Sequence, residues 1–153
     1  MGKLLVKLLD PRAIPPKAAH PGEDTNWDLF ALEDVTLNPL HPTPVRTGIS
    51  ALYVGKPGVS YGLRVNARSG MGVKHGIHVL AGEIDAGYRG EIIVALNWLI
   101  DRRYSLHNGY EIKAGDRIAQ MRPIRVHTDS DVEVVLELPE GKRGDAGFGS
   151  SGR

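Results

Sequence analysis

The chain has 153 residues, of which 41% are hydrophobic and 24% charged, and its formal net charge is +1. This length and composition are typical of a single globular domain with a hydrophobic core. A net charge so close to zero gives no support for bulk electrostatic binding to nucleic acid or to a membrane. The absence of cysteine excludes disulfides and thiolate chemistry and fits a reducing cytoplasm, where we expect the protein to work.

Short apolar segments separated by Gly and Pro recur along the chain. The first, KLLVKLL (3–9), fits a strand or one helical turn, and Lys7 and the prolines after it make it too broken for a signal peptide or a membrane span. The other segments expected to form strands are 47–54, 59–67, 76–85, 91–100, 104–107, 110–113, 116–126 and 131–138. Turn residues join the first six of these in pairs that resemble hairpins, and Asn108-Gly109 is the strongest such signal.

No long stretch keeps a 3.6-residue apolar period, so helices should be few and short. Short strands with regular turns predict an all-β sandwich or barrel of antiparallel strands. After Leu138 the composition changes to Gly and charge, so the core is expected to end there. We therefore expect one β domain over 1–140 and a mobile tail over 141–153.

The stretch GEIDAGYRGE (82–91) gathers acidic residues, a Tyr and an Arg among glycines. Asp85 follows Ile84 at the end of an apolar segment, where a carboxylate needs a reason. One interpretation is a general base that deprotonates water. The other is a turn Asp whose carboxylate accepts hydrogen bonds from backbone N–H groups. The residues alone leave both interpretations open.

Two further stretches carry groups suited to phosphate. Arg68, Ser69 and the N–H of Gly70 can converge on one phosphate, especially if a short helix begins there. Gln120 in the second stretch is a weaker candidate, because it also fits a polar position on an edge strand. Asp28, which lies between Trp27 and Leu29, fits a structural Asp that caps a turn. The alternative for the Arg-Ser-Gly stretch is a plain surface turn.

The C-terminal stretch RGDAGFGSSGR (143–153) has almost no apolar residues to bury, so it should form neither a helix nor a useful strand. A disordered terminus is one interpretation. However, glycine N–H groups, Ser hydroxyls and an Arg side chain all bind phosphate, and Phe148 offers a flat face to a ring. This combination favours a segment that closes over a nucleotide.

Several other chemistries lack their sequence signatures. The six histidines show no HxH or HExxH spacing, so a transition metal held by the protein is not expected. There is neither a GxxxxGK[ST] phosphate loop nor a GxSxG nucleophile elbow between a strand and a helix.

Taken in order, five stretches resemble the five motifs of the trimeric deoxyuridine triphosphate nucleotidohydrolases, or dUTPases. They are NWDLFA (26–31), ARSGMGVKHG (67–76), GEIDAGYRGEI (82–92), GDRIAQM (115–121) and RGDAGFGSSG (143–152). Together they span nearly the whole chain, and five ordered matches are far more specific than any single one. The departures are small: Asn26 replaces a usual Gly, Glu83 a usual apolar residue and Ser151 a usual Thr.

The resemblance implies a distorted jelly-roll with one short helix, assembled as a homotrimer with active sites between subunits. It implies hydrolysis of dUTP to dUMP and pyrophosphate, which limits uracil in DNA and supplies dUMP for thymidylate synthesis. By the motif match, Asp85 would activate the water and hold the 3′-hydroxyl, and Tyr88 would exclude a 2′-hydroxyl. The backbone of Gly82, Glu83 and Ile84 would read the uracil edge.

The same resemblance assigns the remaining site residues. The residues implied to hold the phosphates are Arg68, Ser69, Gly70 and Gln120. Mg²⁺ would arrive mainly on the substrate triphosphate, with Asp28 touching its shell through water. In the tail, Phe148 would cover the uracil, while Arg143, Gly149 and Ser150 would close on the triphosphate.

Two alternatives of other kinds stay open at this point. A dCTP deaminase, possibly bifunctional, shares the fold and an Arg-Ser motif, although Tyr88-Arg89-Gly90 and the complete tail favour the dUTPase. A regulatory protein that responds to dUTP occupancy is the second alternative. Such proteins often carry an extra insertion, and no insertion of that size is visible.

Overall fold

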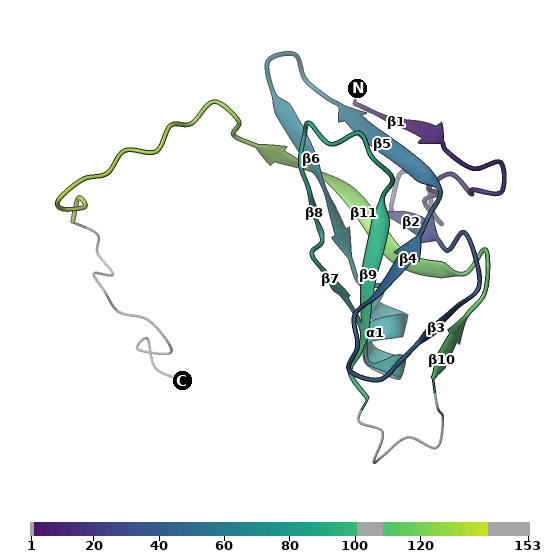
Figure 1. Ribbon diagram of the computed structural model, residues 1–153. Coiled ribbons are helices and arrows are strands. Elements are labelled where there is room, and N and C mark those ends of the chain that lie inside the picture. The colour runs from purple at the N-terminus through teal and green to yellow at the C-terminus, as the bar shows by residue number, and fades with distance from the viewer. Residues whose placement is uncertain (1, 101–108, 141–153) are drawn as a thin grey trace.

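The computed structural model describes residues 2–100 and 109–140, and this part of the chain folds into short β-strands with one α-helix (Figure 1). The elements are β1 (Lys3–Leu8), β2 (Trp27–Phe30), β3 (Val35–Leu37), β4 (Thr43–Arg46), β5 (Ile49–Val54), β6 (Ser60–Asn66), α1 (Ser69–His75), β7 (Ile77–Leu80), β8 (Glu83–Ile84), β9 (Ile93–Trp98), β10 (Tyr110–Ile112) and β11 (Arg117–Val126). The ladders between these strands are antiparallel, which confirms the predicted all-β class with one short helix.

The strands form small sheets rather than one large one. The largest has the order β2-β11-β6-β8, and a three-stranded sheet has the order β4-β9-β7. The pairs β1-β5 and β10-β3 complete the described set. Because neighbouring strands in these sheets are mostly distant in sequence, the chain crosses between sheets repeatedly, as in a distorted jelly-roll.

The hydrophobic core lies between these sheets. In β9, every second side chain is buried, namely Val94, Leu96 and Trp98, as expected for a strand with one face toward a core. The other large side chains with almost no exposed surface are Leu29, Leu37, Val45, Ile49, Ile77, Ile92, Ile112, Ile118 and Met121. None of the helical residues in the described ranges forms a span long and apolar enough to cross a lipid bilayer.

Helix α1 is short because its sequence gives it little intrinsic stability. Gly70 and Gly72 both lie inside its seven residues, and glycine disfavours a helix interior. Arg68 precedes it with extended backbone, and Gly76 ends it in the left-handed conformation at φ +64°. Met71 is its one buried side chain, so the helix is held by packing rather than by propensity.

The segment 76–85, predicted as one strand, is divided into β7 and β8. Ala81 has φ +49°, which interrupts the extended backbone between them. Strand β7 pairs with β9, as the predicted hairpin requires, whereas β8 pairs with β6 in another sheet. This change of sheet places the chain after β8 away from β7.

Two other predicted pairs came out differently. Strands β5 and β6 form as expected, but β5 pairs with β1 and β6 with β11. Strand β10 pairs with β3, and the expected partner segment 104–107 lies outside the described residues. Strands β2, β3 and β4 were not anticipated, because three or four residues are too few for a clear alternation.

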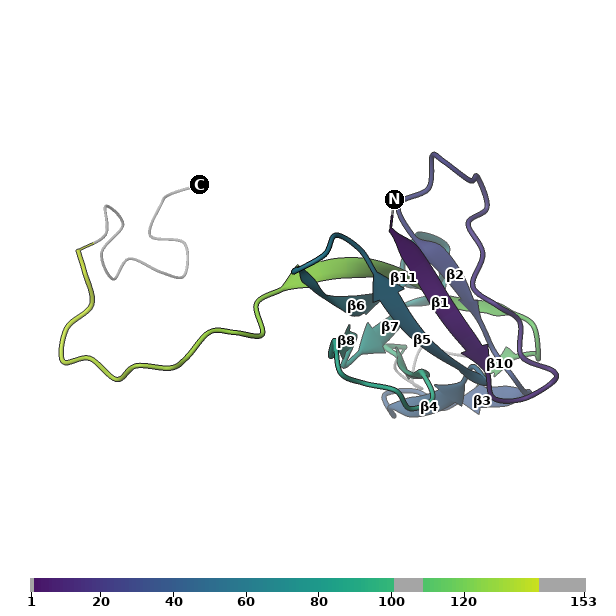
Figure 2. The same cartoon turned by 90° about the horizontal axis from the view of Figure 1, so that it is seen from above.

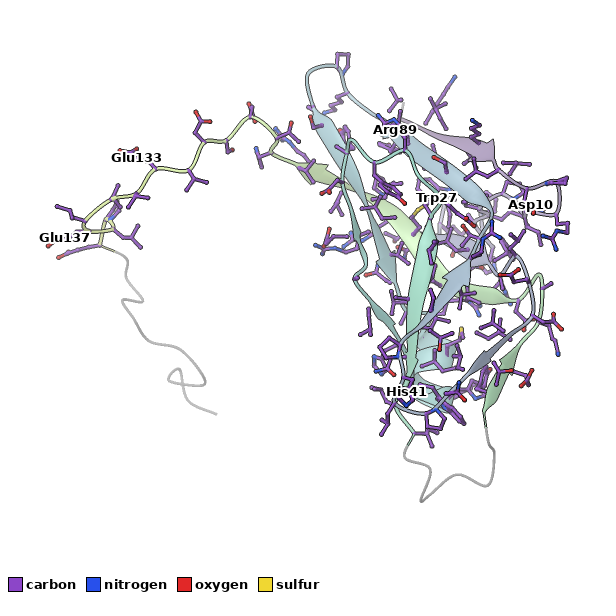
Figure 3. The ribbon with its side chains drawn as sticks, in the orientation of Figure 1. Asp10, Trp27, His41, Arg89, Glu133 and Glu137 are labelled. Atoms are coloured by element: carbon purple, nitrogen blue, oxygen red, sulfur yellow. The ribbon has the colours of Figure 1, made fainter. Side chains whose placement is uncertain are left out.

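The predicted strand over 131–138 is wrong, as is the expectation that the core extends to Leu138. Residues 127–140 are all exposed and contain no strand, and they extend away from the sheets in both views (Figures 1 and 2). Val132 and Leu136 are 94% and 104% exposed. Figure 3 shows Glu133 and Glu137 on this extended segment, far from the side chains of the sheets. No strand of the described chain lies beside it to share hydrogen bonds, so its alternating pattern cannot produce a ladder.

Candidate active site

A cavity of about 200 Å³ lies beside β8 and the segment that leads from it to β9. Four of the residues predicted from the sequence line it: Glu83, Ile84, Asp85 and Tyr88. They come together because they belong to one continuous stretch that turns sharply after β8. The remaining lining includes Glu91 and Ile92, which bring the chain back to β9.

Strand β8 is the outermost strand of its sheet, so half of its backbone groups have no ladder partner in the described chain. Just before it, the Val65 N–H donates to the Gly82 carbonyl at 2.7 Å. A Cβ on Gly82 would collide with the carbonyl oxygen of Val65, so this close approach requires glycine. On the outer surface, Arg64 Nε donates to Glu83 Oε1 at 2.6 Å and ties β8 to β6.

Asp85 and Tyr88 lie at opposite ends of a tight turn. The Tyr88 N–H donates to the Asp85 carbonyl at 3.0 Å, and the Tyr88 hydroxyl donates to the Glu91 carbonyl at 2.9 Å. Within the described ranges, the Asp85 carboxylate is exposed and has neither an ion-pair partner nor a hydrogen-bond donor. The interpretation of Asp85 as a turn carboxylate satisfied by backbone N–H groups therefore finds no such bond here.

A second group of predicted residues surrounds Asp28 in β2, which is buried with 6% of its surface exposed. Arg68 Nε donates to Asp28 Oδ1 at 3.1 Å, and Arg117 Nη1 lies 3.4 Å from Oδ2. Gln120 Nε2 is 3.5 Å from Oδ1 and belongs to β11, which is a central strand rather than an edge. Two arginines thus compensate the buried carboxylate, as a buried charge requires.

The turn before Arg117 is fixed by two acidic side chains. Asp34 Oδ1 accepts from the Ala114 N–H at 2.9 Å and Oδ2 from Lys113 Nζ at 3.1 Å. These bonds, the backbone one first, hold the pKa of Asp34 below its usual value. Asp116 Oδ2 accepts from the Lys113 N–H at 2.8 Å. The turn thereby positions Arg117, the first residue of β11, so that its guanidinium lies beside Asp28.

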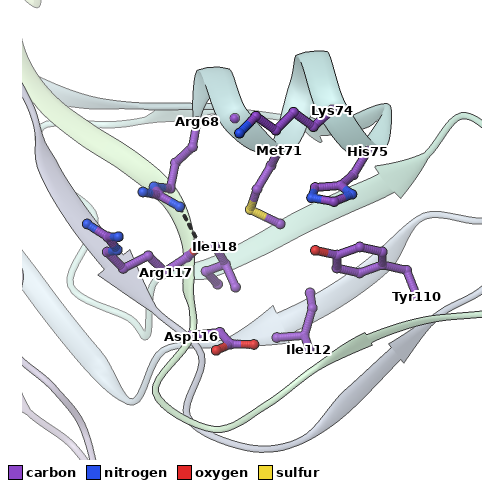
Figure 4. A pocket seen from close by; sticks show the side chains of 10 residues that line it. Arg68, Met71, Lys74, His75, Tyr110, Ile112, Asp116, Arg117 and Ile118 are labelled. Carbon is purple, nitrogen blue, oxygen red and sulfur yellow. Dashed lines mark hydrogen bonds between the residues drawn. The ribbon is translucent and has the colours of Figure 1, made fainter.

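Beside α1 lies a larger cavity of about 380 Å³ (Figure 4). Arg68, Lys74 and Arg117 supply cationic groups around it, and Figure 4 shows Arg68 and Arg117 on the same side. Arg68 Nη1 also donates to the Arg117 carbonyl at 3.3 Å. Ser69 and Gly70 are exposed at the start of α1, next to Arg68. The surroundings of this cavity therefore contain the kinds of groups that bind an anion.

The two cavities have no lining residue in common. Figure 1 shows α1 at one end of the sheets and the segment between β8 and β9 rising toward the other. In Figure 3, Arg89 marks that second end, and His41 lies at the end that carries α1. The structure therefore gathers Asp28, Arg68, Ser69, Gly70 and Gln120 in one place and the 82–88 residues in another.

The predicted tail residues lie outside the described residues: Arg143, Phe148, Gly149 and Ser150. Among described residues, three that line the two cavities were not predicted as site residues from the sequence: Arg117, Lys74 and Glu91. Arg117 and Glu91 lie inside the quoted motif stretches, but nothing local indicates that their side chains contact Asp28 and Arg46. Only the fold brings these pairs together, because the members of each lie 89 and 45 positions apart.

In the part of the chain that the structure describes, no three His, Cys, Asp or Glu side chains gather at one point. Asp28 has arginines facing both of its carboxylate oxygens, and the other acidic side chain beside the larger cavity in the described ranges, Asp116, accepts from the Lys113 N–H. This donor set does not enclose a metal by itself. It fits Mg²⁺ only where a ligand supplies phosphate oxygens, the usual arrangement for this hard cation.

Solved structures resemble this fold over nearly its whole length. A dUTPase of Staphylococcus bacteriophage 80alpha, solved with dUPNHPP, matches with a TM-score of 0.83 and 28% identity over 99% of both chains. A mutant dUTPase of phage phi11 of S. aureus matches with a TM-score of 0.74 and 25% identity over 90% of this chain and 99% of that one, and its description names a structural Mg(II) ion.

Sequence relatives agree. Deoxyuridine 5′-triphosphate nucleotidohydrolases of Paramecium bursaria Chlorella virus 1 and Clostridium novyi are 42% and 40% identical to this chain over 152 residues, and each match covers at least 98% of both sequences. The family model described as dUTPase matches residues 13–152. The deaminase and regulatory alternatives gain no support from these relatives. The chain therefore belongs to the dUTPase family, and it is a dUTP diphosphatase that hydrolyses dUTP to dUMP and pyrophosphate.

Proposed function

We propose that Asp85 is the general base of this hydrolysis and also holds the 3′-hydroxyl of the sugar. The observation that carries the proposal is its exposed carboxylate in the cavity shared with Tyr88, without an ionic partner among the described residues. Such a carboxylate can take a proton from water as the water attacks the α-phosphorus. Tyr88 packs under the deoxyribose, where its ring leaves no room for a 2′-hydroxyl.

The uracil ring binds along the free edge of β8. The backbone of Gly82, Glu83 and Ile84 offers N–H and C=O groups there, and they match the acceptors and donors of the uracil edge. Because these groups belong to the main chain and are fixed by pairing with β6, they discriminate by shape and hydrogen-bond pattern. A 5-methyl group or an exocyclic amine would disturb this arrangement.

The triphosphate binds at the end of the folded molecule that carries α1, to Arg68, Ser69, Gly70 and Gln120. Asp28 holds Arg68 in a defined orientation, and an oriented guanidinium costs less entropy when it binds an anion. Mg²⁺ bound to the triphosphate would neutralise charge that develops on the phosphate oxygens. A contact from Asp28 to the water shell of that ion is the second role we propose for this carboxylate.

Active sites form between chains of a homotrimer. One dUTP needs both the cavity beside Asp85, called here the nucleoside cavity, and the phosphate-binding residues around Arg68. These two places lie at separate ends of the folded chain. A neighbouring chain that brings its Arg68 group to the Asp85 cavity completes the site. The exposed valines and leucines of 127–140 supply apolar surface for such an assembly.

The tail completes the reaction cycle. Phe148 covers the uracil, while Arg143, Gly149 and Ser150 close on the triphosphate and exclude water late. We place the enzyme in the cytoplasm, where its nucleotide substrate is made and where a chain without cysteine needs no oxidising compartment. Neither nucleic acid nor membrane takes part directly.

The activity is tested by incubating the protein with Mg²⁺ and dUTP, dTTP, dCTP or UTP in parallel and measuring pyrophosphate release. Rapid release from dUTP and slow release from the others is expected. Ammonia release from dCTP would instead identify a deaminase.

The shared site is tested by co-refolding equal amounts of Asp85→Asn and Arg68→Gln chains, each inactive alone. Random assembly makes about three quarters of the trimers mixed, and each mixed ring contains one intact site in three. Activity should rise to about a quarter of wild type, with trimers confirmed by size-exclusion mass. If both residues of a site came from one chain, mixing would restore nothing.

A further inference from the structure

The segment 46–50, which ends β4 and begins β5, binds residues 89–92, the second half of the segment that joins β8 to β9. Thr47 Oγ1 donates to the Ile92 carbonyl at 2.5 Å, and the Ile92 N–H donates to the Ile49 carbonyl at 2.8 Å. Ser50 Oγ donates to the Arg89 carbonyl at 2.9 Å. These bonds fix the loop residues that follow Tyr88.

Glu91 is the central residue of this contact. Its carboxylate accepts from Arg46 Nε at 3.1 and 3.2 Å, and Arg46 Nη2 lies 3.1 Å from Oε2. The same carboxylate accepts from the Gly48 N–H at 2.8 Å, and the Glu91 side chain is only 17% exposed. Through its main chain, Glu91 accepts the hydroxyl of Tyr88 at 2.9 Å. One residue is thus anchored by its side chain and holds Tyr88 by its carbonyl.

Two glycines allow the close contacts around Glu91 and Tyr88, because a side chain at either position would collide with a neighbour. Gly48 has φ +69°, and a Cβ there would lie 2.9 Å from both Ala13 Cβ and Leu32 Cδ1. Gly90 lies against the Tyr88 ring so closely that a Cβ would collide with the phenol. The Tyr88 ring therefore packs on Gly90, and its hydroxyl is held by the Glu91 carbonyl. The rest of the ring is open to solvent.

We infer that Glu91 and Arg46 are positioning residues that set the preference of this enzyme for deoxyribose over ribose. The inference rests on the proposed binding of the sugar against Tyr88. Discrimination against one hydroxyl requires a wall that does not move, since a mobile ring would yield to the ribose. Arg46 and Glu91 fix the Glu91 carbonyl, and that carbonyl fixes the Tyr88 ring.

This role is separable from stability. Arg46 is 45% exposed, and a partly exposed ion pair contributes little to the folding free energy. The neighbouring bonds of Thr47, Ile49 and Ser50 remain when the pair is removed. Loss of the pair should therefore change where Tyr88 lies before it changes whether the protein folds.

The test compares Glu91→Gln, Arg46→Gln and Tyr88→Phe with wild type, measuring kcat/KM for dUTP and for UTP and the Tm. The control is Glu111→Gln, which removes an exposed carboxylate bound to Thr36 and Lys113 outside the nucleoside cavity. Each test variant should lower the dUTP/UTP ratio about tenfold, mainly by improving UTP, with a small change in Tm. The control should keep the wild-type ratio.

The double variant Tyr88→Phe/Glu91→Gln separates positioning from a general structural effect. If Glu91 acts through the Tyr88 hydroxyl, the double variant should be no less selective than the worse single variant. Additive losses, or an unchanged ratio in the folded single variants, would overturn the inference. Arg46→Lys should recover part of the selectivity by restoring the charge. If wild type itself does not distinguish dUTP from UTP, the proposed sugar site fails instead.

Discussion

Asp28 and Arg68 are 40 positions apart in sequence and meet as an ion pair of 3.1 Å beneath the proposed phosphate site. The carboxylate is almost fully buried, whereas the guanidinium keeps 24% of its side chain exposed. The buried Asp28 carboxylate thus fixes the orientation of the Arg68 guanidinium, part of which stays exposed to solvent. Arg117 approaches the other oxygen of the same carboxylate at 3.4 Å.

Asp28→Asn should raise the KM for dUTP, because the neutral amide no longer orients Arg68 and Arg117. Removing one partner of a buried pair usually costs about 3–5 kcal/mol. The cost here should be nearer about 1 kcal/mol, since both arginines can reach water. Steady-state kinetics at several Mg²⁺ concentrations checks the role. An unchanged Mg²⁺ requirement supports orientation of the arginines, whereas a requirement shifted to higher Mg²⁺ supports the contact with the metal's water shell.

Asp85→Asn should keep the fold and the binding of a non-hydrolysable dUTP analogue but lower kcat by about 10²–10⁴-fold, the usual contribution of a general base. The amide keeps the shape of the side chain and cannot accept the proton from water. Single-turnover kinetics with calorimetric binding separates the two effects. A variant with near-normal turnover would show that another group removes the proton.

Gly82→Ala should weaken dUTP binding and lower the Tm together. The added methyl group would collide with the Val65 carbonyl, so β8 must move away from β6 and take the uracil-reading edge with it. The matched control is Gly87→Ala, where a Cβ meets open space. Thermal denaturation and the KM for dUTP provide the measurements. Equal behaviour of the two variants would contradict the edge-reading role.

Charges placed on the exposed segment 127–140 test the assembly. Val134→Asp and Leu136→Asp alter side chains that are 94% and 104% exposed in one chain, so they should not affect the folding of the single chain. If these side chains are buried between chains of a trimer, the charges should shift the size-exclusion mass toward monomer and reduce turnover. A Val73→Asp variant, 87% exposed on α1, serves as the control for added charge. A trimer mass unchanged in all variants would remove this segment from the interface.

Asp34→Asn should reduce stability only above acidic pH. The Ala114 N–H and Lys113 lower the pKa of Asp34 from its usual value of 3.8, so the folded state binds the proton less readily than the unfolded chain. Its stabilisation is therefore fully present above about pH 4 and is lost as pH falls through the lower folded pKa. The Tm difference between wild type and variant should shrink along that range. A difference that stays constant to low pH would contradict this linkage.

Much of the fold follows from local pattern. Strands β5, β6, β9 and β11 lie where alternating or continuous apolar residues and turn signals predicted them, and α1 begins at the Arg-Ser-Gly stretch. The extended segment 131–138 shows the limit of this reasoning. Its alternation is as clear as that of a real strand, but a strand also needs a neighbour, and the described chain provides none.

The sequence by itself determined the chemistry: which stretches carry a carboxylate, a phenol, arginines and glycines in the order of a dUTPase. It also determined the all-β class, since period-2 patterns and turn residues act over a few positions. Only the tertiary structure decided that Asp28 holds Arg68 and Arg117, that Arg46 binds the carboxylate of Glu91 while the Glu91 carbonyl holds Tyr88, and that the two cavities lie at separate ends. Asp28 lies 40 and 89 positions from Arg68 and Arg117, and Arg46 lies 45 positions from Glu91, so these contacts depend on the packing of the whole core rather than on any local preference.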